Sequence, residues 1–64
     1  DYKEVSMSSL NERVQTAIKS YEASYDVEKI ERSATKSMTR VTLKEKKSAM
    51  KKVVILNDEG NEVK

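Results

Sequence analysis

The sequence predicts an α+β fold in which one amphipathic helix packs on a three- to four-stranded antiparallel sheet. Apolar residues recur with a helical period within residues 9–24, and apolar and polar residues alternate within residues 38–44. The apolar run Val53–Leu56 is followed by Asn57-Asp58-Glu59-Gly60, a pattern typical of a β-hairpin. The 64 residues form one domain at most, with a lead-in over 1–8, a helix over 9–24 and antiparallel strands over 26–64.

The helix is predicted from its cap and from its apolar stripe. Ser9 and Glu12 have the S-x-x-E spacing of a capping box, which would start the helix at Ser9. The composition becomes extended after Ala23 and Ser24, where we expect the helix to end. Before it, residues 1–8 show no clear period and are interpreted as a short strand or an extended lead-in. One helical face carries the apolar residues Leu10, Val14, Ala17, Ile18 and Tyr21, and the same spacing reaches Tyr25.

The strands are predicted from alternation, with one irregularity. In residues 26–32, Val27 and Ile30 are three positions apart, so both can face the core only if a β-bulge lies between them. Residues 38–44 alternate well, residues 50–57 form another strand, and residues 62–64 begin a short last one. Residues 45–49 are interpreted as a turn. The rival interpretation is a short helix over 43–52, because that stretch is rich in good helix formers.

The closing turn contains the only glycine of the chain. Glycine adopts positive φ without steric cost, so Gly60 predicts a type I turn that closes on a left-handed residue. Asn57 and Asp58 are expected to hydrogen-bond to their own backbone. The acidic residues of this turn lack the full spacing of a calcium loop, so no metal site is predicted. The three methionines (Met7, Met38 and Met50) are expected to fill gaps in the core.

The residues offer little that could carry catalysis. The chain has no histidine and no cysteine, so it lacks the usual general base and the thiol nucleophile. Two S-x-x-K spacings, Ser33 to Lys36 and Ser48 to Lys51, match a Ser/Lys dyad, but this spacing is common in any chain rich in serine and lysine. We therefore predict a non-enzymatic protein without catalytic, cofactor-binding or metal-binding residues. A hydrolase is the least favoured class.

Positive charge is concentrated in residues 36–52. This segment has a net charge of +6 and the rest of the chain −4. Such a segment can bind nucleic acid or another polyanion, but it contains no aromatic residue for base stacking, and lysines also protect sheet edges from aggregation. A solvated face is the favoured interpretation and an anionic partner the alternative. The candidate contacts with an anionic partner are Lys36, Arg40, Lys44, Lys46, Lys47, Lys51 and Lys52.

Several motifs together resemble a known family. The helix carries V-x-x-A-I-x-x-Y from Val14 to Tyr21, and a Val-x-x-Ile-Glu strand follows at residues 27–31. The alternating strand contains Val41 and Leu43, and the chain closes with V-x-L-N-D-E-G-N-E-V over residues 54–63. Over residues 8–64 the chain is similar to the PepSY-like group of small bacterial domains, which is related in fold to beta-lactamase inhibitor protein.

The resemblance implies a location, a role and a kind of partner. It implies an extracytoplasmic protein (periplasmic, envelope-associated or secreted) that needs no cofactor and has a binding or inhibitory role. The expected partner is a protein or a second copy of the chain, contacted through the face or the edge of the sheet. Nucleic acid is possible but not favoured. The longest apolar run, Val53–Leu56, is far too short to span a membrane, and no signal peptide is visible at Asp1.

Overall fold

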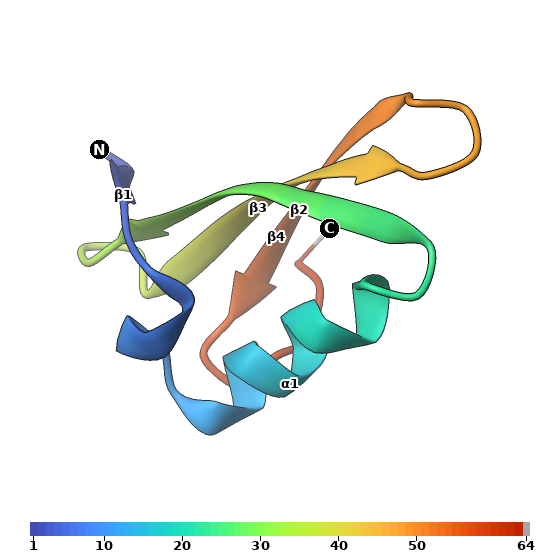
Figure 1. Cartoon of the computed structure of the whole chain (residues 1–64). Coiled ribbons are helices and arrows are strands. Elements are labelled where there is room, and N and C mark those ends of the chain that lie inside the picture. Colours follow the sequence, from blue (N-terminus) through green and yellow to red (C-terminus); the bar gives the residue numbers. More distant parts are fainter. Residues whose placement is uncertain (64) are drawn as a thin grey trace.

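The chain folds into one antiparallel sheet with a single helix across one of its faces. The structure is a computed structural model that describes residues 1–63. The elements follow in the order β1 (Lys3–Glu4), the 3₁₀ turn η1 (Met7–Ser9), α1 (Glu12–Tyr21), β2 (Tyr25–Ser33), β3 (Met38–Glu45) and β4 (Lys51–Asn57), as Figure 1 shows. The sheet order is β1-β2-β3-β4, and every neighbouring pair is antiparallel. The predicted α+β class with a helix on a three- to four-stranded sheet is confirmed.

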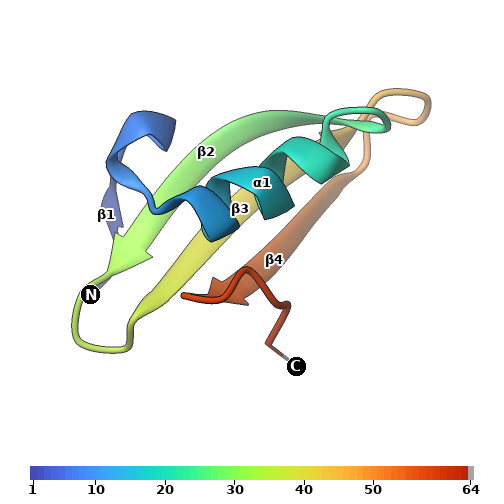
Figure 2. The same cartoon turned by 90° about the horizontal axis from the view of Figure 1, so that it is seen from below.

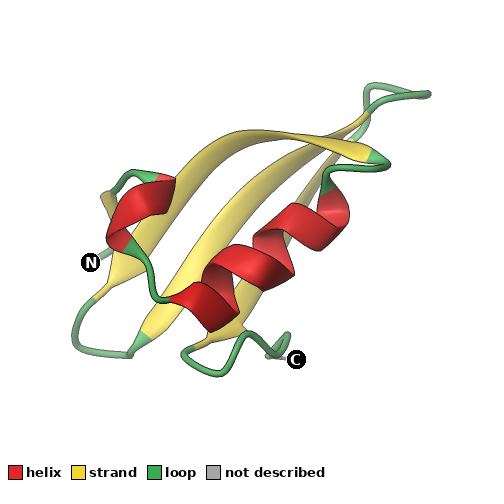
Figure 3. Cartoon of the chain, turned by 60° about the horizontal axis from the view of Figure 1, so that its bottom comes forward, coloured by secondary structure: helices red, strands yellow, loops and turns green. Residues whose placement is uncertain are grey.

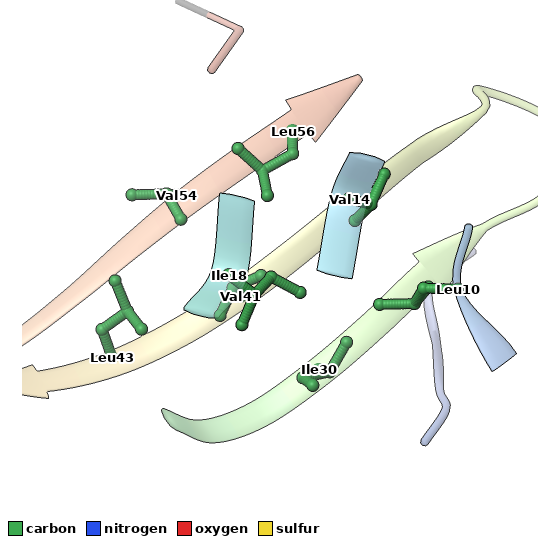
Figure 4. Packing of buried hydrophobic residues seen from close by; sticks show 8 residues of the cluster. All are labelled: Leu10, Val14, Ile18, Ile30, Val41, Leu43, Val54 and Leu56. Carbon is green, nitrogen blue, oxygen red and sulfur yellow. The ribbon is translucent and has the colours of Figure 1, made fainter. Parts of the chain in front are cut away.

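The core lies between α1 and one face of the sheet (Figures 2 and 3). Val14 and Ile18 supply the helical side, and both are almost completely buried. The residues that face them lie on alternate positions of the strands, as the two-residue period of a strand requires. Figure 4 shows the eight buried hydrophobic residues: Leu10, Val14, Ile18, Ile30, Val41, Leu43, Val54 and Leu56.

The helix is shorter than predicted, and its N-cap is a different residue. Asn11 is the N-cap, and its Oδ1 accepts a hydrogen bond of 2.9 Å from the amide of Val14. Ser9 instead lies in η1, where its hydroxyl donates to the carbonyl of Ser6. Glu12 is the first helical residue, so it cannot complete a capping box with Ser9. The capping-box prediction is wrong because Leu10, which is buried, takes extended backbone and delays the helix.

The other helix end also differs from the predicted boundary at Ser24. Glu22 is the C-cap residue, and residues 22–24 form the turn into β2. Tyr25 is therefore the first residue of β2 rather than part of the helical stripe. The two tyrosine rings still meet, because Tyr21 and Tyr25 pack edge to face with their ring centroids 6.1 Å apart.

The bulge expected between Val27 and Ile30 is present. The register of β2 against β3 shifts between Val27 and Lys29, so Glu28 is the additional residue. The shift lets Val27 and Ile30 face the helix although they are three positions apart, since a bulge places two residues opposite one. Val27 packs against the core and Ile30 belongs to it. The structure therefore meets the condition that the spacing of Val27 and Ile30 sets for both residues to face the core.

Residues 46–50 form a turn and not a helix, so the preferred interpretation is confirmed. The amide of Glu45 donates to the carbonyl of Met50, and the amide of Ala49 donates to the carbonyl of Glu45, both at 2.8 Å. Ala49 has a φ of 62°, a left-handed conformation that ends any helical path. The tip of this β3–β4 hairpin reaches past the end of α1 (Figure 2).

The closing turn has the predicted backbone, with one correction. Gly60 has a φ of 84°, and the side chain of Asn57 accepts from the amides of Glu59 and Asn61. Asp58 does not hydrogen-bond to its own backbone; its carboxylate accepts from Arg32 at 2.7 Å. Of the predicted last strand over residues 62–64, Glu62 forms an isolated bridge with Leu56, and Lys64 lies outside the described residues.

The methionine prediction holds for one residue of the three. Met7 packs against the core. Met38 is half-buried on the face of the sheet opposite α1, because its neighbour Thr39 faces the helix side and is buried. Met50 is 69% exposed at the β3–β4 hairpin, so for this residue the expectation is wrong. The turn carries Met50 beyond the area that α1 covers.

Candidate interaction surface

The seven basic residues predicted as anionic contacts do not form one patch. Lys36 lies in the β2–β3 turn, at one end of the sheet, and Arg40 lies near the same end of β3. The other five lie in and beside the β3–β4 turn, at the opposite end of the sheet. Four residues along a strand, from Arg40 to Lys44, span about 13 Å. The five lysines at the far end are Lys44, Lys46, Lys47, Lys51 and Lys52, which we call the hairpin lysines.

Arg40 is held by contacts within the chain. Its Nε donates to Oε1 of Glu31 at 2.9 Å, and its guanidinium lies 4.2 Å from the ring centroid of Tyr2. Glu31 is largely buried on the face opposite the helix and also pairs with Lys29 at 3.4 Å. The hydrogen bond from Arg40 holds the pKa of Glu31 below its ordinary value of 4.5, and Glu31 raises the pKa of Arg40 in return. Arg40 therefore serves to attach the N-terminal segment to the sheet.

The hairpin lysines are more accessible. Lys51 pairs with Glu28 at 3.3 Å, but its side chain remains 68% exposed, and a pair this exposed contributes little free energy. The ammonium of Lys52 lies 5.9 Å from the ring centroid of Tyr25. Lys46 and Lys47 are exposed in the turn. The one acidic residue of this turn, Glu45, accepts a hydrogen bond from the hydroxyl of Ser48.

The sequence predicted contact through the face or the edge of the sheet without specifying which edge. β4 forms one of the two outer edges. Met50 points its carbonyl toward β3, because that carbonyl accepts from the amide of Glu45. Ile55 points its carbonyl away from β3, because that carbonyl accepts from the amide of Val63. Backbone groups alternate in direction along an antiparallel strand. The N–H and C=O groups of Lys51 and Val53 therefore also point away from β3.

Only part of this edge is covered by the described residues. In the segment after the closing turn, the amide of Val63 donates to the carbonyl of Ile55, and the carbonyl of Asn61 accepts from the amide of Asn57. Within residues 1–63, the four outward backbone groups of Lys51 and Val53 have no hydrogen-bond partner. We call residues 50–54 the β4 edge.

Hydrophobic side chains are exposed on the same short stretch. Val53 is 55% exposed and Met50 is 69% exposed. They are the two most exposed large hydrophobic residues among those described, and they lie three positions apart on the β4 edge. An unpaired strand with exposed apolar side chains is a template for pairing with another chain.

The other outer edge of the sheet is less regular. β1 pairs with β2 only at Glu31 and Arg32, and the amide of Val5 adds one bond to Ile30. The remaining part of β2 contains the bulge at Glu28, which disrupts the repeat of its backbone groups. A bulge is a common device that protects an edge, and the register of β4 against β3 contains none. β4 is the regular edge.

A shallow polar depression lies at the start of α1, and its groups satisfy one another. Asn11 donates to the carbonyl of Asp58 at 3.0 Å, and Arg32 donates to the carboxylate of Asp58 and to the hydroxyl of Thr39. Every buried side-chain nitrogen or oxygen in the described part of the chain has a hydrogen-bond partner. These contacts join the helix start, β2 and the closing turn.

Comparison with models of protein families, with curated proteins and with solved structures found no match. No helix within residues 1–63 has the length and hydrophobicity that crossing a membrane would require.

Proposed function

We propose that the chain is a small, non-enzymatic interaction module that binds a protein partner through the edge of its sheet. The observation that supports this proposal is the β4 edge, where four outward backbone groups lie beside the exposed side chains of Met50 and Val53. Addition of a strand to such an edge is a common way for proteins to bind extended segments. The resemblance to PepSY-like domains supports a binding or inhibitory role and an extracytoplasmic location.

The alternative function is binding of nucleic acid or another polyanion through residues 36–52. The observation that favours it is the convergence of the five hairpin lysines at one end of the sheet. The division of the seven basic residues into two groups counts against it, as does the engagement of Arg40 by Glu31 and Tyr2. The single tyrosine near the hairpin lysines, Tyr25, lies beneath Lys52 rather than in the open.

The first test is light scattering behind size exclusion, at low and high salt, with and without a short DNA duplex. The proposed function predicts no mass increase with the duplex even at low salt, where the attraction between exposed lysines and phosphate is strongest. A complex with the duplex whose affinity falls steeply with salt would replace the proposed function by the alternative. The matched variant Lys46→Glu/Lys47→Glu should abolish that complex if the hairpin lysines form it.

Amide hydrogen exchange provides the second test. In the free protein the amides of Lys51 and Val53 point to solvent and should exchange rapidly, whereas those of Lys52 and Val54 point toward β3 and should be protected. Binding at the edge should slow the two exposed amides and leave the other two unchanged. Protection that appears only on the face of the sheet, without any change at Lys51 and Val53, would exclude the edge as the site.

A further inference from the structure

We propose that the β4 edge accepts an extended acidic segment of a partner protein as an antiparallel fifth strand, with side chains in the order apolar, acidic, acidic, apolar. This inference rests on the proposed function and specifies the partner chemistry. It follows from the direction of the backbone groups and from the side chains beside them.

The backbone determines the alignment of the added strand. Lys51 and Val53 each present one N–H and one C=O outward, so two residues of an antiparallel strand can each form a doubly hydrogen-bonded pair with them. The residue between these two lies opposite Lys52. The added strand cannot extend past Val53, because the amide of Val63 already donates to the carbonyl of Ile55, the next outward residue of β4. The site therefore takes about four residues.

The side chains determine the composition. On the face away from α1, Lys51 lies beside Lys44 of β3, and Val53 lies beside Thr42. An incoming residue opposite Lys51 is adjacent to the 68% exposed side chain of Lys51, which also pairs with Glu28, and Lys44 lies one strand farther away. An incoming residue opposite Val53 is adjacent to an exposed aliphatic group. Cross-strand pairs of opposite charge, and pairs of apolar side chains, each stabilise a sheet by about 0.2–1 kcal/mol. An acidic residue suits the first position and an apolar one the second.

The helix side and the turn complete the pattern. Lys52 lies beside Leu43 on the side of α1, so the residue opposite Lys52 is best acidic. Met50 is exposed next to Lys51 and suits an apolar residue. Because the added strand is antiparallel to β4, its first residue lies opposite Val53 and its fourth lies opposite Met50. The resulting order is apolar, acidic, acidic, apolar.

A second copy of the chain fits this edge poorly. A symmetric pairing centred on Lys52 places Lys52 directly opposite its equivalent at the closer of the two Cα spacings, about 4.5 Å. A pairing centred on Lys51 places the two Lys51 side chains opposite each other. A pairing centred on Val53 places Lys51 opposite Ile55, whose carbonyl is already bonded to Val63. Like charges directly opposite destabilise the first two registers, and the occupied carbonyl of Ile55 penalises the third. An acidic segment avoids these penalties.

Nucleic acid also fits the edge less well than a peptide. The edge presents equal numbers of N–H donors and C=O acceptors at Lys51 and Val53. Phosphate oxygens accept hydrogen bonds but do not donate them, so phosphate leaves the two carbonyls unsatisfied. A peptide backbone satisfies all four groups.

The test uses the intact chain and a capped, fluorescently labelled peptide with the sequence Thr-Val-Glu-Asp-Leu-Thr. The expected result is binding that a peptide with Lys-Lys in place of Glu-Asp does not show. N-methylation of the valine or the aspartate, whose amides would face β4, should weaken binding about tenfold or more, since each loses a hydrogen bond and adds a clash. N-methylation of the glutamate, whose amide would face solvent, is the matched control and should have little effect.

Variants of the chain test the same contact from the other side. Lys51→Glu/Lys52→Glu should lower the affinity for the acidic peptide about tenfold and raise the affinity for the Lys-Lys peptide. Lys19→Glu/Lys36→Glu makes the same change of net charge away from the edge and should change neither affinity appreciably. Val53→Pro removes an outward amide without removing a bond to β3, because proline is tolerated at this position of an edge strand, and should abolish binding. Circular dichroism checks that each variant folds.

The outcomes separate this inference from the proposed function. Equal binding of the acidic and basic peptides, with the expected effect of N-methylation, would overturn the acidic preference and leave the edge as the site. A dimer in light scattering that Val53→Pro abolishes, without binding of any peptide, would make a second copy the occupant. Peptide binding that is insensitive to N-methylation and is lost at high salt would show that the peptide does not bind as an added strand. A duplex that binds and displaces the peptide would overturn both proposals.

Discussion

At the scale of single residues, a few side chains fasten the elements to one another. Arg40 lies between the carboxylate of Glu31 and the ring of Tyr2, so one guanidinium connects β2, β3 and the N-terminal segment. Gly60 lies near the same end of the sheet and lets the closing turn approach α1 by having no side chain. An added Cβ there would lie 2.6 Å from the carbonyl oxygen of Arg13 in α1. Both contacts join segments that are distant in sequence, so both contribute to the tertiary structure.

The first prediction concerns Gly60. Gly60→Ala should lower the free energy of unfolding by about 2 kcal/mol or more, because alanine is strained at a φ of 84° and its methyl group meets backbone that cannot move away cheaply. Urea unfolding followed by circular dichroism measures the change. The control is Glu59→Ala, an exposed neighbour in the same turn, which should stay within about 0.5 kcal/mol of the wild type. Equal effects of the two substitutions would contradict the close approach of the turn to α1.

The second prediction concerns the pH dependence due to Glu31. Because its pKa in the folded protein is lowered, the unfolded state takes up the proton first as pH falls. The stabilisation by ionised Glu31 is therefore present above its ordinary pKa of 4.5 and is lost as pH falls through the lower, folded value. Glu31→Gln should be less stable than the wild type at neutral pH, and the difference should shrink at acidic pH. A difference that is independent of pH, in urea unfolding curves recorded across this range, would rule out the role of the charge.

At the scale of the elements, several local features were predictable and the exact boundaries were not. The apolar stripe of the helix, the bulge near Glu28 and the turn over residues 45–49 all follow from local patterns, and all are confirmed. The helix start does not follow locally, because Ser9 and Asn11 are both good caps. The buried position of Leu10 and the bond from Asn11 to Asp58 select Asn11. These contacts become visible only when the turn at residues 57–60 is placed beside the helix.

The third prediction tests this choice of cap. Asn11→Ala should lower the free energy of unfolding by about 1 kcal/mol or somewhat more, because it removes the acceptor for Val14 and the bond to Asp58. Ser9→Ala, by contrast, should cost little, since the hydroxyl of Ser9 is exposed and bonds only to Ser6. Asn11→Asp keeps the cap, loses the bond to Asp58 and places a carboxylate beside the carbonyl of Asp58, so its cost should lie between those of Ser9→Ala and Asn11→Ala. A larger effect of Ser9→Ala than of Asn11→Ala would contradict Asn11 as the N-cap and support the capping box that starts at Ser9.

At the scale of the whole molecule, the hydrophobic face of the sheet is covered mainly by α1, with Val5, Met7 and Leu10 from the segment before the helix adding to the cover. Folded domains are stable by roughly 0.05–0.15 kcal/mol per residue, which gives a 64-residue chain about 3–10 kcal/mol. The described chain has no cysteine and so no disulfide to add to this margin. The stability of the sheet therefore depends on how well α1 packs on it.

The fourth prediction follows from this dependence. Ile18 is completely buried between α1 and the sheet, so Ile18→Ala should cost about 2–5 kcal/mol, a large share of the total. Thermal unfolding should show a greatly lowered midpoint or a chain that is partly unfolded at 37 °C. Thr16→Ala, on the exposed side of the same helix, should leave the midpoint nearly unchanged. A cooperative transition of wild-type stability in Ile18→Ala would show that the helix contributes little to the core.

The α+β class, the helical stripe, the bulge and the turns could be predicted from the sequence, because each depends on residues close together in the chain. The sequence also shows seven of the thirteen basic residues within 36–52, but not that the sheet separates them into two groups. The identity of the exposed edge follows from long-range contacts, because it depends on strand order and on how far the segment after Gly60 runs along β4. The same holds for the exposure of Met50, which depends on where α1 ends above the sheet, and for that of Val53, which lies on the face that α1 does not cover. Local patterns specify the elements, whereas the free surfaces are determined by long-range packing.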